Sequence, residues 1–382
     1  MSECMDFGFL CNDPAPPNGR KVAIIGAGPS GLAAAGYLAC LGYQVDVYDK
    51  LPRAGGLMAF GIPSHRIPQA RVDEGIKRLK RKLGVNFHLR TKICCSVPLY
   101  EEEGDHFSAD MRGLGDLVAG HDAVMICSGS WRSRKLNVPG EDLPGVYSSL
   151  QFLFPIRAVR YGAPNVSVPT VAGKRVAVVG AGHSAVDAAH SAVALGAAEV
   201  HVLYRRTSAE APCGRFEIER MQDMGIRWHE LVSPVAITGQ GQVEAIELTQ
   251  CHLGEPDATG RRCPLPDVSE RLVLPVDVVI GAIGEIPTPP FSRELGLDNV
   301  RKGEVRWLHM TRIENVFVAG DALTGPSKIG KAVYSGLRAA RSLTNWLDLK
   351  AQNRQAEYKY DDLIAKEARG FPGPPLHKEP GS

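Results

Sequence analysis

The stretch that decides the fold reads Lys21-Val-Ala-Ile-Ile-Gly26-Ala-Gly28-Pro-Ser-Gly31. Its first five residues are mostly apolar and are followed at once by three closely spaced glycines. Small and apolar residues continue to Leu41, which is typical of a buried helix, and Val45–Tyr48 reads as the next strand. Strand, glycine-rich turn, helix and strand in this order predict a βαβ unit.

The spacing of the glycines is Gly-x-Gly-x-x-Gly, and each position has a physical role. Gly26 permits the tight turn, Gly28 lets a pyrophosphate approach the backbone, and Gly31 permits close packing of helix on strand. The helix that begins at Pro29 offers the free N–H groups of Ser30 and the residues after it to phosphate. These features predict a dinucleotide site, and a purely structural glycine-rich turn is the alternative.

An acidic residue in the right place strengthens the dinucleotide interpretation. Asp49 closes the second strand 18 residues after Gly31, with Lys50 beside it. A carboxylate there can accept hydrogen bonds from the ribose hydroxyls of an adenosine.

The same pattern returns 154 residues later as Arg175-Val-Ala-Val-Val-Gly180-Ala-Gly182-His-Ser-Ala185. Two such units in one chain predict two dinucleotide-binding domains. His183 and Ser184 open the second helix, where the backbone N–H of His183 is expected to matter more than its ring. Ala185 replaces the third glycine, which the motif tolerates.

The second unit differs where the first carries its ribose-binding acid. Tyr204 takes the place of Asp49, and Arg205 and Arg206 follow directly. Guanidinium groups suit phosphate, so this pair favours NADP(H) over NAD(H), with NAD not excluded. The alternative is a pair of solvated arginines at a strand end.

Each unit also has a later buried strand that ends at a glycine. These strands are Asp122–Gly129 and Asp277–Gly284. The predicted fold is therefore α/β, with two Rossmann-like domains and the NAD(P) domain inserted into the FAD domain. The predicted boundaries are an N-terminal arm at 1–19, a discontinuous FAD domain at 20–145 and 288–349, an NAD(P) domain at 146–287, and an extended tail at 350–382.

Several features of the first domain favour FAD over NAD. Gly320-Asp321 follows the apolar strand 315–319 and precedes a helical pattern. An acid there can accept from a ribityl hydroxyl, and the helix start can lie beneath the flavin ring, although a plain helix N-cap is the alternative reading of Asp321. Gly56 and Leu57 are expected to bring backbone close to the flavin. Arg66 is a candidate for positive charge near the flavin or its phosphates, or else a surface arginine.

Composition narrows the class of protein further. The chain has 382 residues, 44% of them hydrophobic, and a net charge of +2, which gives no argument for nucleic acid as a partner. No apolar run reaches the length of a membrane span, and the acidic N-terminus is not a secretory signal. The nine cysteines are irregularly spaced without a Cys-x-x-Cys, which argues against a disulfide framework or a metal site and fits a reducing cytoplasm.

Together these motifs resemble the small subunit family of glutamate synthase. The resemblance rests on the paired glycine turns, on Gly55–Pro68 and Tyr204–Pro212, and on Leu253–Arg262 and Val318–Gly325, and it covers about residues 20–345. It implies an FAD-dependent NAD(P) oxidoreductase that exchanges electrons with iron–sulfur centres. It places FAD on Gly26, Gly28, Gly31, Asp49, Gly56, Leu57 and Asp321, and the nicotinamide dinucleotide on Gly180, Gly182, Ala185, Arg205 and Arg206. We add Gly129, Gly320 and Gly284 as candidate cofactor contacts at the ends of the matching strands.

The chain departs from this family at its front. Cys4 and Cys11 are the cysteines that precede the first glycine turn, and two thiolates cannot hold a usual four-ligand cluster. We therefore expect the flavin subunit of a multi-subunit oxidoreductase, with an iron–sulfur subunit and a catalytic subunit as partners. That catalytic partner is an aldehyde oxidoreductase using tungsten or molybdenum, a glutamate synthase-like enzyme or a ferredoxin-linked enzyme. The alternatives are a stand-alone NAD(P)H:acceptor flavin reductase and a redox-silent FAD-binding assembly module. We expect no catalytic side chain, because flavin N5 carries the hydride transfer.

Overall fold

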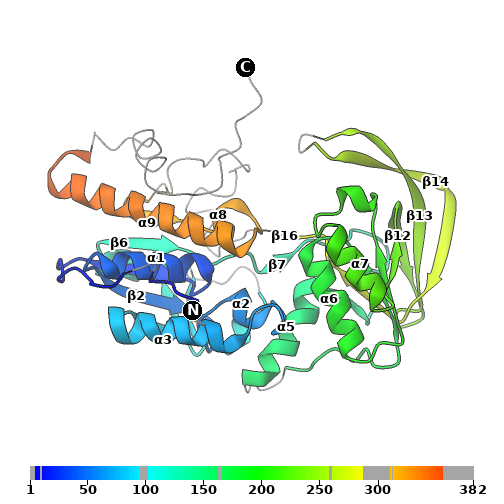
Figure 1. Cartoon of the computed structure of the whole chain (residues 1–382), viewed down its shortest axis with the longest axis horizontal. Coiled ribbons are helices and arrows are strands. Elements are labelled where there is room, and N and C mark those ends of the chain that lie inside the picture. The colour runs from blue at the N-terminus through cyan, green and yellow to red at the C-terminus, as the bar shows by residue number, and fades with distance from the viewer. Residues whose placement is uncertain are drawn as a thin grey trace.

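The computed structural model describes residues 5–8, 11–94, 102–161, 166–257, 260–286, 310–311 and 313–355. Figure 1 shows two lobes side by side, joined through the short strands β7 (Arg132–Ser133) and β16 (Glu285–Ile286). These two strands pair with each other in antiparallel fashion. The two segments in which the chain passes between the lobes therefore lie side by side.

A parallel five-stranded sheet forms the centre of the first lobe. Its strand order is β17 (Val316–Val318), β6 (Ala123–Ile126), β1 (Lys21–Ile25), β2 (Gln44–Asp49) and β3 (Asn86–Leu89). Strands from both ends of the chain thus share one sheet, because β17 pairs with β6. The crossover after β1 is the predicted βαβ unit, with α1 at Pro29–Cys40.

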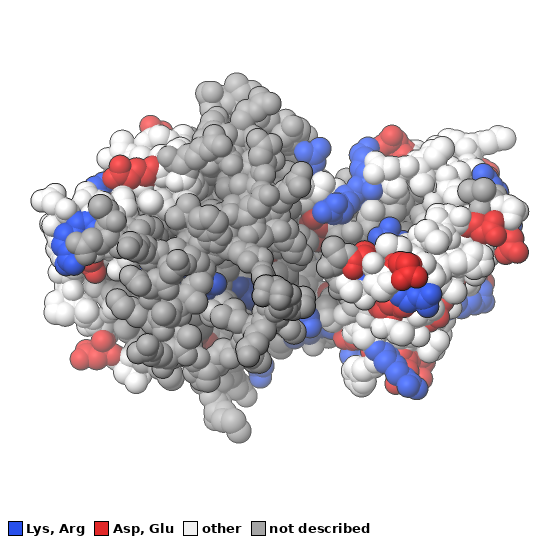
Figure 2. All heavy atoms as spheres, turned by 90° about the horizontal axis from the view of Figure 1, so that it is seen from above, with Lys and Arg blue, Asp and Glu red and all other residues white. Residues whose placement is uncertain are grey.

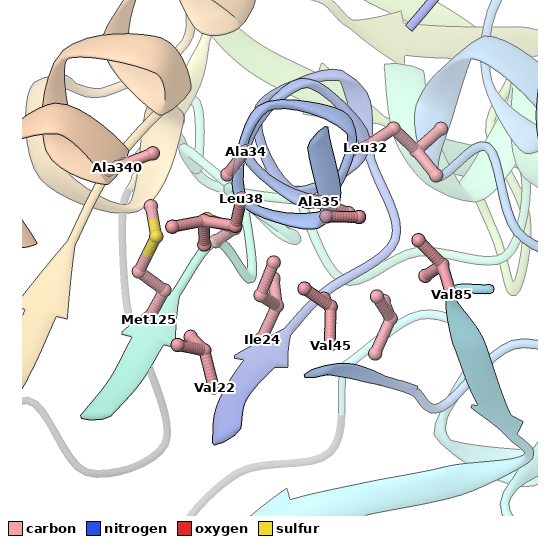
Figure 3. Close-up of a cluster of buried hydrophobic side chains, with 14 of the residues drawn as sticks. Val22, Ile24, Leu32, Ala34, Ala35, Leu38, Val45, Val85, Met125 and Ala340 are labelled. Carbon is pink, nitrogen blue, oxygen red and sulfur yellow. The ribbon is translucent and has the colours of Figure 1, made fainter. Parts of the chain in front are cut away.

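Alternate residues of the first sheet are buried in two different hydrophobic cores, one on each side of the sheet. Val22 and Ile24 point to the side covered by α1, α3 (Gln69–Leu83) and α9 (Ile329–Ala351), as Figure 3 shows. Ala23 and Ile25 point to the other side, against α4 (Leu114–Gly120) and the strand pair β4 (Thr91–Cys94) and β5 (Asp110–Gly113). Burial on both sides explains why β1 is almost wholly apolar.

The second lobe repeats this plan. Its parallel sheet has the order β11 (Arg227–His229), β10 (Glu199–Leu203), β9 (Arg175–Val179), β15 (Val278–Gly281) and β8 (Val146–Ser148). One side is covered by the helices α5 (Ser149–Ala158), α6 (His183–Ala194) and α7 (Arg215–Asp223). The other side packs against an antiparallel sheet of β12 (Val232–Thr238), β13 (Ala245–Pro256) and β14 (Arg262–Pro275).

The fold class predicted from the repeat is confirmed: this is an α/β protein with two Rossmann-like sheets. The two units match in register as well as in order. Ile25 pairs with Tyr48 in the first sheet and Val179 with Leu203 in the second. The domain boundaries stay a prediction, since Pro287–Pro290 and the following residues to 309 lie outside the described residues.

The two ends of the chain differ in part from the predicted arm and tail. Helix α9 continues to Ala351, beyond the predicted start of the tail at 350, and residues 356–382 lie outside the described residues, as do Cys4 and Cys95. A disulfide joins Cys11 to Cys40, which the irregular cysteine spacing did not predict. The arm lies against the end of α1, where Ala15 N–H donates to the Cys40 carbonyl. Among the described residues no helix is long and apolar enough to cross a membrane.

Charge is mixed over the molecular surface. Figure 2 shows basic and acidic side chains interspersed on the second lobe, on the right in that view. This agrees with the near-neutral net charge and gives no large field of one sign on the described part of that face.

Candidate dinucleotide sites

The first glycine turn is built as its spacing predicts. Gly26 has φ +106°, and a Cβ there would overlap the carbonyl of Cys127 at the end of β6. A Cβ on Gly31 would overlap the carbonyl of Gly26, so that glycine lets α1 lie close to the turn. In contrast, no heavy atom comes within 4 Å of a Cβ built on Gly28. Gly28 therefore faces open space at the N-terminus of a 12-residue helix, the place where a pyrophosphate fits.

The second turn has the same backbone pattern as the first. Gly180 has φ +131° and meets the carbonyl of Ala282 at the end of β15, while Gly182 again has open space. The N–H of Gly180 donates to Leu203, as that of Gly26 donates to Tyr48. Ala185, in place of the third glycine, is buried in the core of the second lobe. Two cradles of the same shape thus lie in one chain.

One cavity of about 610 Å³ reaches from the first turn to the start of the second helix. Residues predicted for FAD that line it are Gly26, Gly28, Pro29, Ser30, Asp49, Lys50, Gly56, Leu57, Arg66, Gly129 and Asp321. From the second lobe, His183, Ser184 and Asp187 of α6 also line it. Gly31, Gly180, Gly182, Ala185, Arg205, Arg206, Gly284 and Gly320 are not among the residues that line it.

Asp49 stands at the end of β2, as predicted, and is buried. Its two carboxylate oxygens accept from the N–H of Ala27, at 2.6 Å, and of Leu51, at 2.8 Å. Burial raises the pKa of this carboxyl, against the pull of those N–H groups and of Lys50. Since each carboxylate oxygen has two lone pairs, Asp49 can hold the glycine turn in shape and still accept from a ribose.

Lys50 belongs to a buried ion cluster at the same end of the cavity. Its Nζ lies 3.0 Å from Glu102 and 2.9 Å from Asp105, and Lys92 also pairs with Asp105 at 2.5 Å. Lys50 lies over the ring of Trp131 at 4.6 Å. Most of its charge is therefore already paired within the protein.

The opposite wall is formed by the start of α9 and by Asp321. Lys328, Ile329 and Gly330 line the cavity at the N-terminus of the 23-residue helix α9. The positive end of that helix faces the space predicted for the flavin. Asp321 begins the short helix α8 (Asp321–Thr324) after Gly320, the N-cap, and its carboxylate accepts from Ser327 at 2.6 Å. Asp321 is thus one position past the N-cap, and burial raises its pKa.

The two arginines after β10 differ from each other. Arg205 is exposed, whereas Arg206 is buried and its guanidinium bonds to the carbonyl of Arg262 at 2.6 Å and to Asp257 at 3.1 Å. The prediction that both guanidiniums face a 2′-phosphate therefore needs correction at Arg206. Arg206 is directed toward the β13–β14 hairpin, where Arg262 and Asp257 bind its guanidinium, whereas Arg205 is exposed.

The predicted role of Arg66 near the flavin or its phosphates stays a prediction. Arg66 lines the cavity, but its Nε lies 2.5 Å from Asp187 on α6 and its Nη1 2.8 Å from Glu217 on α7. Burial raises the pKa of Asp187 to about 6, against the pull of Arg66. The guanidinium of Arg66 is thus paired with two carboxylates of the second lobe.

Sequence reasoning missed some of the residues that line the cavity. Trp131, Lys92 and Glu102 come from segments without a motif, and Glu285 follows the predicted Gly284 directly. Burial raises the pKa of Glu285, with Ser149 opposing and Asp321 adding to the effect. Its place after a strand-ending glycine was the one signal that pointed to it. Among the described residues there is no group of three or more potential ligands that could hold a metal ion.

Two glycine turns, each at the carboxyl end of a parallel sheet, define a protein with two dinucleotide-binding domains, and one cavity reaches from the first turn to His183 and Ser184 after the second. Comparison with known proteins gives the family. The model for the family described as pyridine nucleotide-disulphide oxidoreductase matches residues 20–336. The chain belongs to the pyridine nucleotide-disulphide oxidoreductase family. The predictions of an NAD(P)-dependent oxidoreductase and of FAD and NAD(P)H as cofactors are thereby confirmed.

The curated relatives include small chains of glutamate synthase, the family that the sequence motifs resemble. The chain is 32% identical to the glutamate synthase [NADPH] small chain of Halomonas elongata, over 86% of this chain and 68% of that one. It is 35% identical to the beta subunit of the NADP(+)-dependent formate dehydrogenase of Moorella thermoacetica, over 92% of this chain and 47% of the relative. It is 33% identical to the beta subunit of the NADPH-Fe(3+) oxidoreductase of Geobacter sulfurreducens, over 88% and 51%. The chain spans about half the length of several of these relatives.

Solved structures agree on the fold. FprA of Mycobacterium tuberculosis in complex with NADPH superposes with a TM-score of 0.71 at 22% identity, over 93% of this chain and 89% of that one. Thioredoxin reductase of T. acidophilum gives 0.55 at 22% identity, over 85% and 98%.

Proposed function

We propose that this chain is an NADP(H)-linked, FAD-containing electron-transfer subunit of a multi-subunit oxidoreductase. It exchanges hydride between nicotinamide and flavin, and single electrons with iron–sulfur centres of a partner subunit. The observation that carries the proposal is the single cavity lined by the first glycine turn and by the start of the helix that follows the second. FAD bound at one end of this cavity and a nicotinamide dinucleotide bound at the other would bring the flavin and nicotinamide rings together.

The residues present fit FAD. The open space at Gly28 would take the pyrophosphate, Asp49 the ribose, and the start of α9 with Asp321 the flavin end. When bound, FAD accepts a hydride from a nicotinamide and can release its electrons one at a time. Gly182, His183 and Ser184 would hold the nicotinamide dinucleotide at the start of α6. The residues of this chain would bind the two cofactors and orient them toward each other in the cavity.

Arg205 supports NADP(H) over NAD(H). It is exposed two residues after the end of β10, directly after Tyr204, which stands where the first lobe carries Asp49. An acid there would repel a 2′-phosphate, whereas a guanidinium binds it. Three relatives in the comparison also carry NADP(+) or NADPH in their names.

The names of the relatives also support a role as a subunit. They describe parts of a glutamate synthase, a formate dehydrogenase and an NADPH-Fe(3+) oxidoreductase, so one module serves several partners. An iron–sulfur subunit as the electron partner is part of this proposal, and Cys11, bonded to Cys40, is not a free thiolate for a cluster. A hetero-oligomer in the cytoplasm, with an aldehyde oxidoreductase as catalytic subunit, remains the finer prediction.

Native purification followed by anaerobic titration tests this function. NADPH is expected to bleach the flavin band first, and then an iron–sulfur band of the copurified subunit, with NADH less effective. Rapid reduction of a quinone or dye by a lone chain would support the stand-alone reductase instead. A flavin that neither nucleotide reduces would contradict both functions.

A further inference from the structure

Three charged residues from three separate segments meet beside the cavity, where Arg66 and Asp187 line the wall, and we call Arg66, Asp187 and Glu217 the Arg66 cluster. Arg66 lies between α2 (Leu57–Phe60) and α3, Asp187 on α6 and Glu217 on α7. Nε of Arg66 is 2.5 Å from Oδ1 of Asp187, and Nη1 is 2.8 Å from Oε1 of Glu217. Their side chains are 23%, 9% and 13% exposed, so water screens these pairs only weakly.

The Arg66 cluster joins the two lobes. Arg66 belongs to the first lobe, and both carboxylates belong to helices that cover the second sheet. Asp187 lies one turn after His183 and Ser184, on the helix that begins at the second glycine turn. Any shift of Asp187 relative to Arg66 therefore also moves the second turn relative to the cavity.

A second contact between the lobes lies on α5. Phe154 stacks on Phe60 with ring centroids 5.7 Å apart, and Arg157 donates to the Ala59 carbonyl at 2.8 Å. The α5 contact is largely apolar and buried, and it involves neither α6 nor α7. Without the Arg66 cluster, the α5 contact, the β7–β16 pair and the ring contact between His65 and His190 would keep the lobes attached, but the second lobe could turn about them.

We propose that Arg66 is a positioning residue for hydride transfer: its two ion pairs hold α6, and with it the second glycine turn, at the angle that places the nicotinamide ring on the flavin. The role in hydride transfer rests on the proposed function, whereas the role of Arg66 in fixing the angle between the two lobes does not. Hydride transfer depends steeply on alignment, and a misplacement of about 1 Å can cost about 100-fold in rate. Binding of the adenine half of the nucleotide depends on the second lobe itself and is less sensitive to this angle.

Kinetics of the FAD-loaded protein test the proposal first. Arg66→Gln is expected to lower the limiting rate of flavin reduction by NADPH about 10- to 100-fold. The dissociation constant of NADPH should change by less than about threefold. Asp187→Asn, which keeps the shape of the side chain, should act in the same direction, and the double variant should be little worse than either single one. Arg66→Lys, which keeps the charge without the forked geometry, should recover part of the rate.

Small-angle X-ray scattering gives a readout that needs no activity. Arg66→Gln and Asp187→Asn should both broaden the distribution of interatomic distances between the lobes. Arg175→Gln is the matched control, because it removes an ion pair with Asp277 at 2.7 Å that lies wholly within the second lobe. That control should leave both the limiting rate and the scattering unchanged.

The outcomes separate this proposal from the proposed function. If NADPH does not reduce the wild-type flavin, the proposed function fails, and scattering alone decides the positioning role. If the wild type is reduced and both variants match it in rate and scattering, Arg66 has no positioning role. A loss confined to the dissociation constant of NADPH would also overturn the proposal.

Discussion

Replacing Arg205 and Arg206 one at a time separates nucleotide recognition from folding. Arg205 is exposed at the strand end, whereas Arg206 is buried with a side chain only 5% exposed. The sequence treats the two as a pair, but the structure gives them different surroundings. Arg205→Ala and Arg206→Ala should therefore fail in different assays.

The magnitude for Arg205 follows from one lost charged contact. A hydrogen bond to a charged group contributes about 1.5–3 kcal/mol, so kcat/KM for NADPH should fall roughly 10- to 150-fold. NADH has no 2′-phosphate, and its kcat/KM should change by less than about twofold. The stability of Arg205→Ala should stay within about 0.5 kcal/mol of the wild type, as for other exposed positions.

The magnitude for Arg206 comes from two lost bonds. Truncation leaves the carbonyl of Arg262 without this donor and takes from Asp257 a partner at 3.1 Å. Asp257 is 29% exposed and can hydrate, so we expect a cost of about 2 kcal/mol rather than that of a fully buried pair. The unfolding temperature should drop by about 4 °C, and kcat/KM should fall equally for both nucleotides.

Steady-state reduction of a dye with each nucleotide, together with calorimetry, measures all of these quantities. Equal loss of NADPH and NADH activity in Arg205→Ala would refute the 2′-phosphate assignment. A selective loss of NADPH in Arg206→Ala, without loss of stability, would show that the buried arginine is the phosphate ligand.

Three further changes test the cavity and its frame. Gly28→Val should give a folded chain that purifies without FAD, whereas the matched Gly182→Val should retain FAD and lose reduction by NADPH. Both glycines have open space and a negative φ, so each valine should fit the backbone and block only its own dinucleotide site. Flavin absorbance and stopped-flow rates distinguish the two variants, and loss of FAD in both would contradict two separate dinucleotide sites. Asp105→Asn should cost about 3 kcal/mol at neutral pH, because buried Lys50 and Lys92 lose a partner. Burial alone would raise the pKa of Asp105, but the lysines and the Glu102 N–H outweigh it and hold that pKa below its usual value. The stabilisation by Asp105 is therefore present above about pH 4 and is lost as the pH falls through the folded pKa. Denaturant unfolding at several pH values should show that the stability of the variant falls less steeply in acid than that of the wild type, and an equal fall would count against the ion cluster. Phe154→Ala should cost about 3–5 kcal/mol through the cavity left beside Phe60; a chemical-denaturation midpoint equal to that of the wild type would show that α5 does not join the lobes.

Much of the fold could be predicted because it depends on local patterns. The glycine spacing at Gly26 and Gly180 fixes a turn within a few residues, and the repeat carries that turn into a second sheet. The equivalence of Asp49 and Tyr204 also follows, since the strand register on each side is set by neighbouring segments. Such features need no knowledge of how the two lobes meet.

The contacts that the sequence did not reveal are those between distant segments. Glu217 is 151 residues from Arg66, and their pairing depends on the placement of one lobe against the other. Asp257, which accepts a hydrogen bond from Arg206, lies 51 residues away in the β13–β14 hairpin, and its sequence did not reveal that partner. The bond from Cys11 to Cys40 likewise depends on the arm folding back along α1. Each of these partners was one candidate among many charged residues or thiols.

Anaerobic mixing of the FAD-loaded chain with NADPH, followed by a one-electron acceptor, tests the central claim most directly. We predict that NADPH bleaches the flavin band rapidly and that the acceptor then restores it. A chain that retains FAD but is bleached by neither NADPH nor NADH would contradict the shared cavity as a route for hydride.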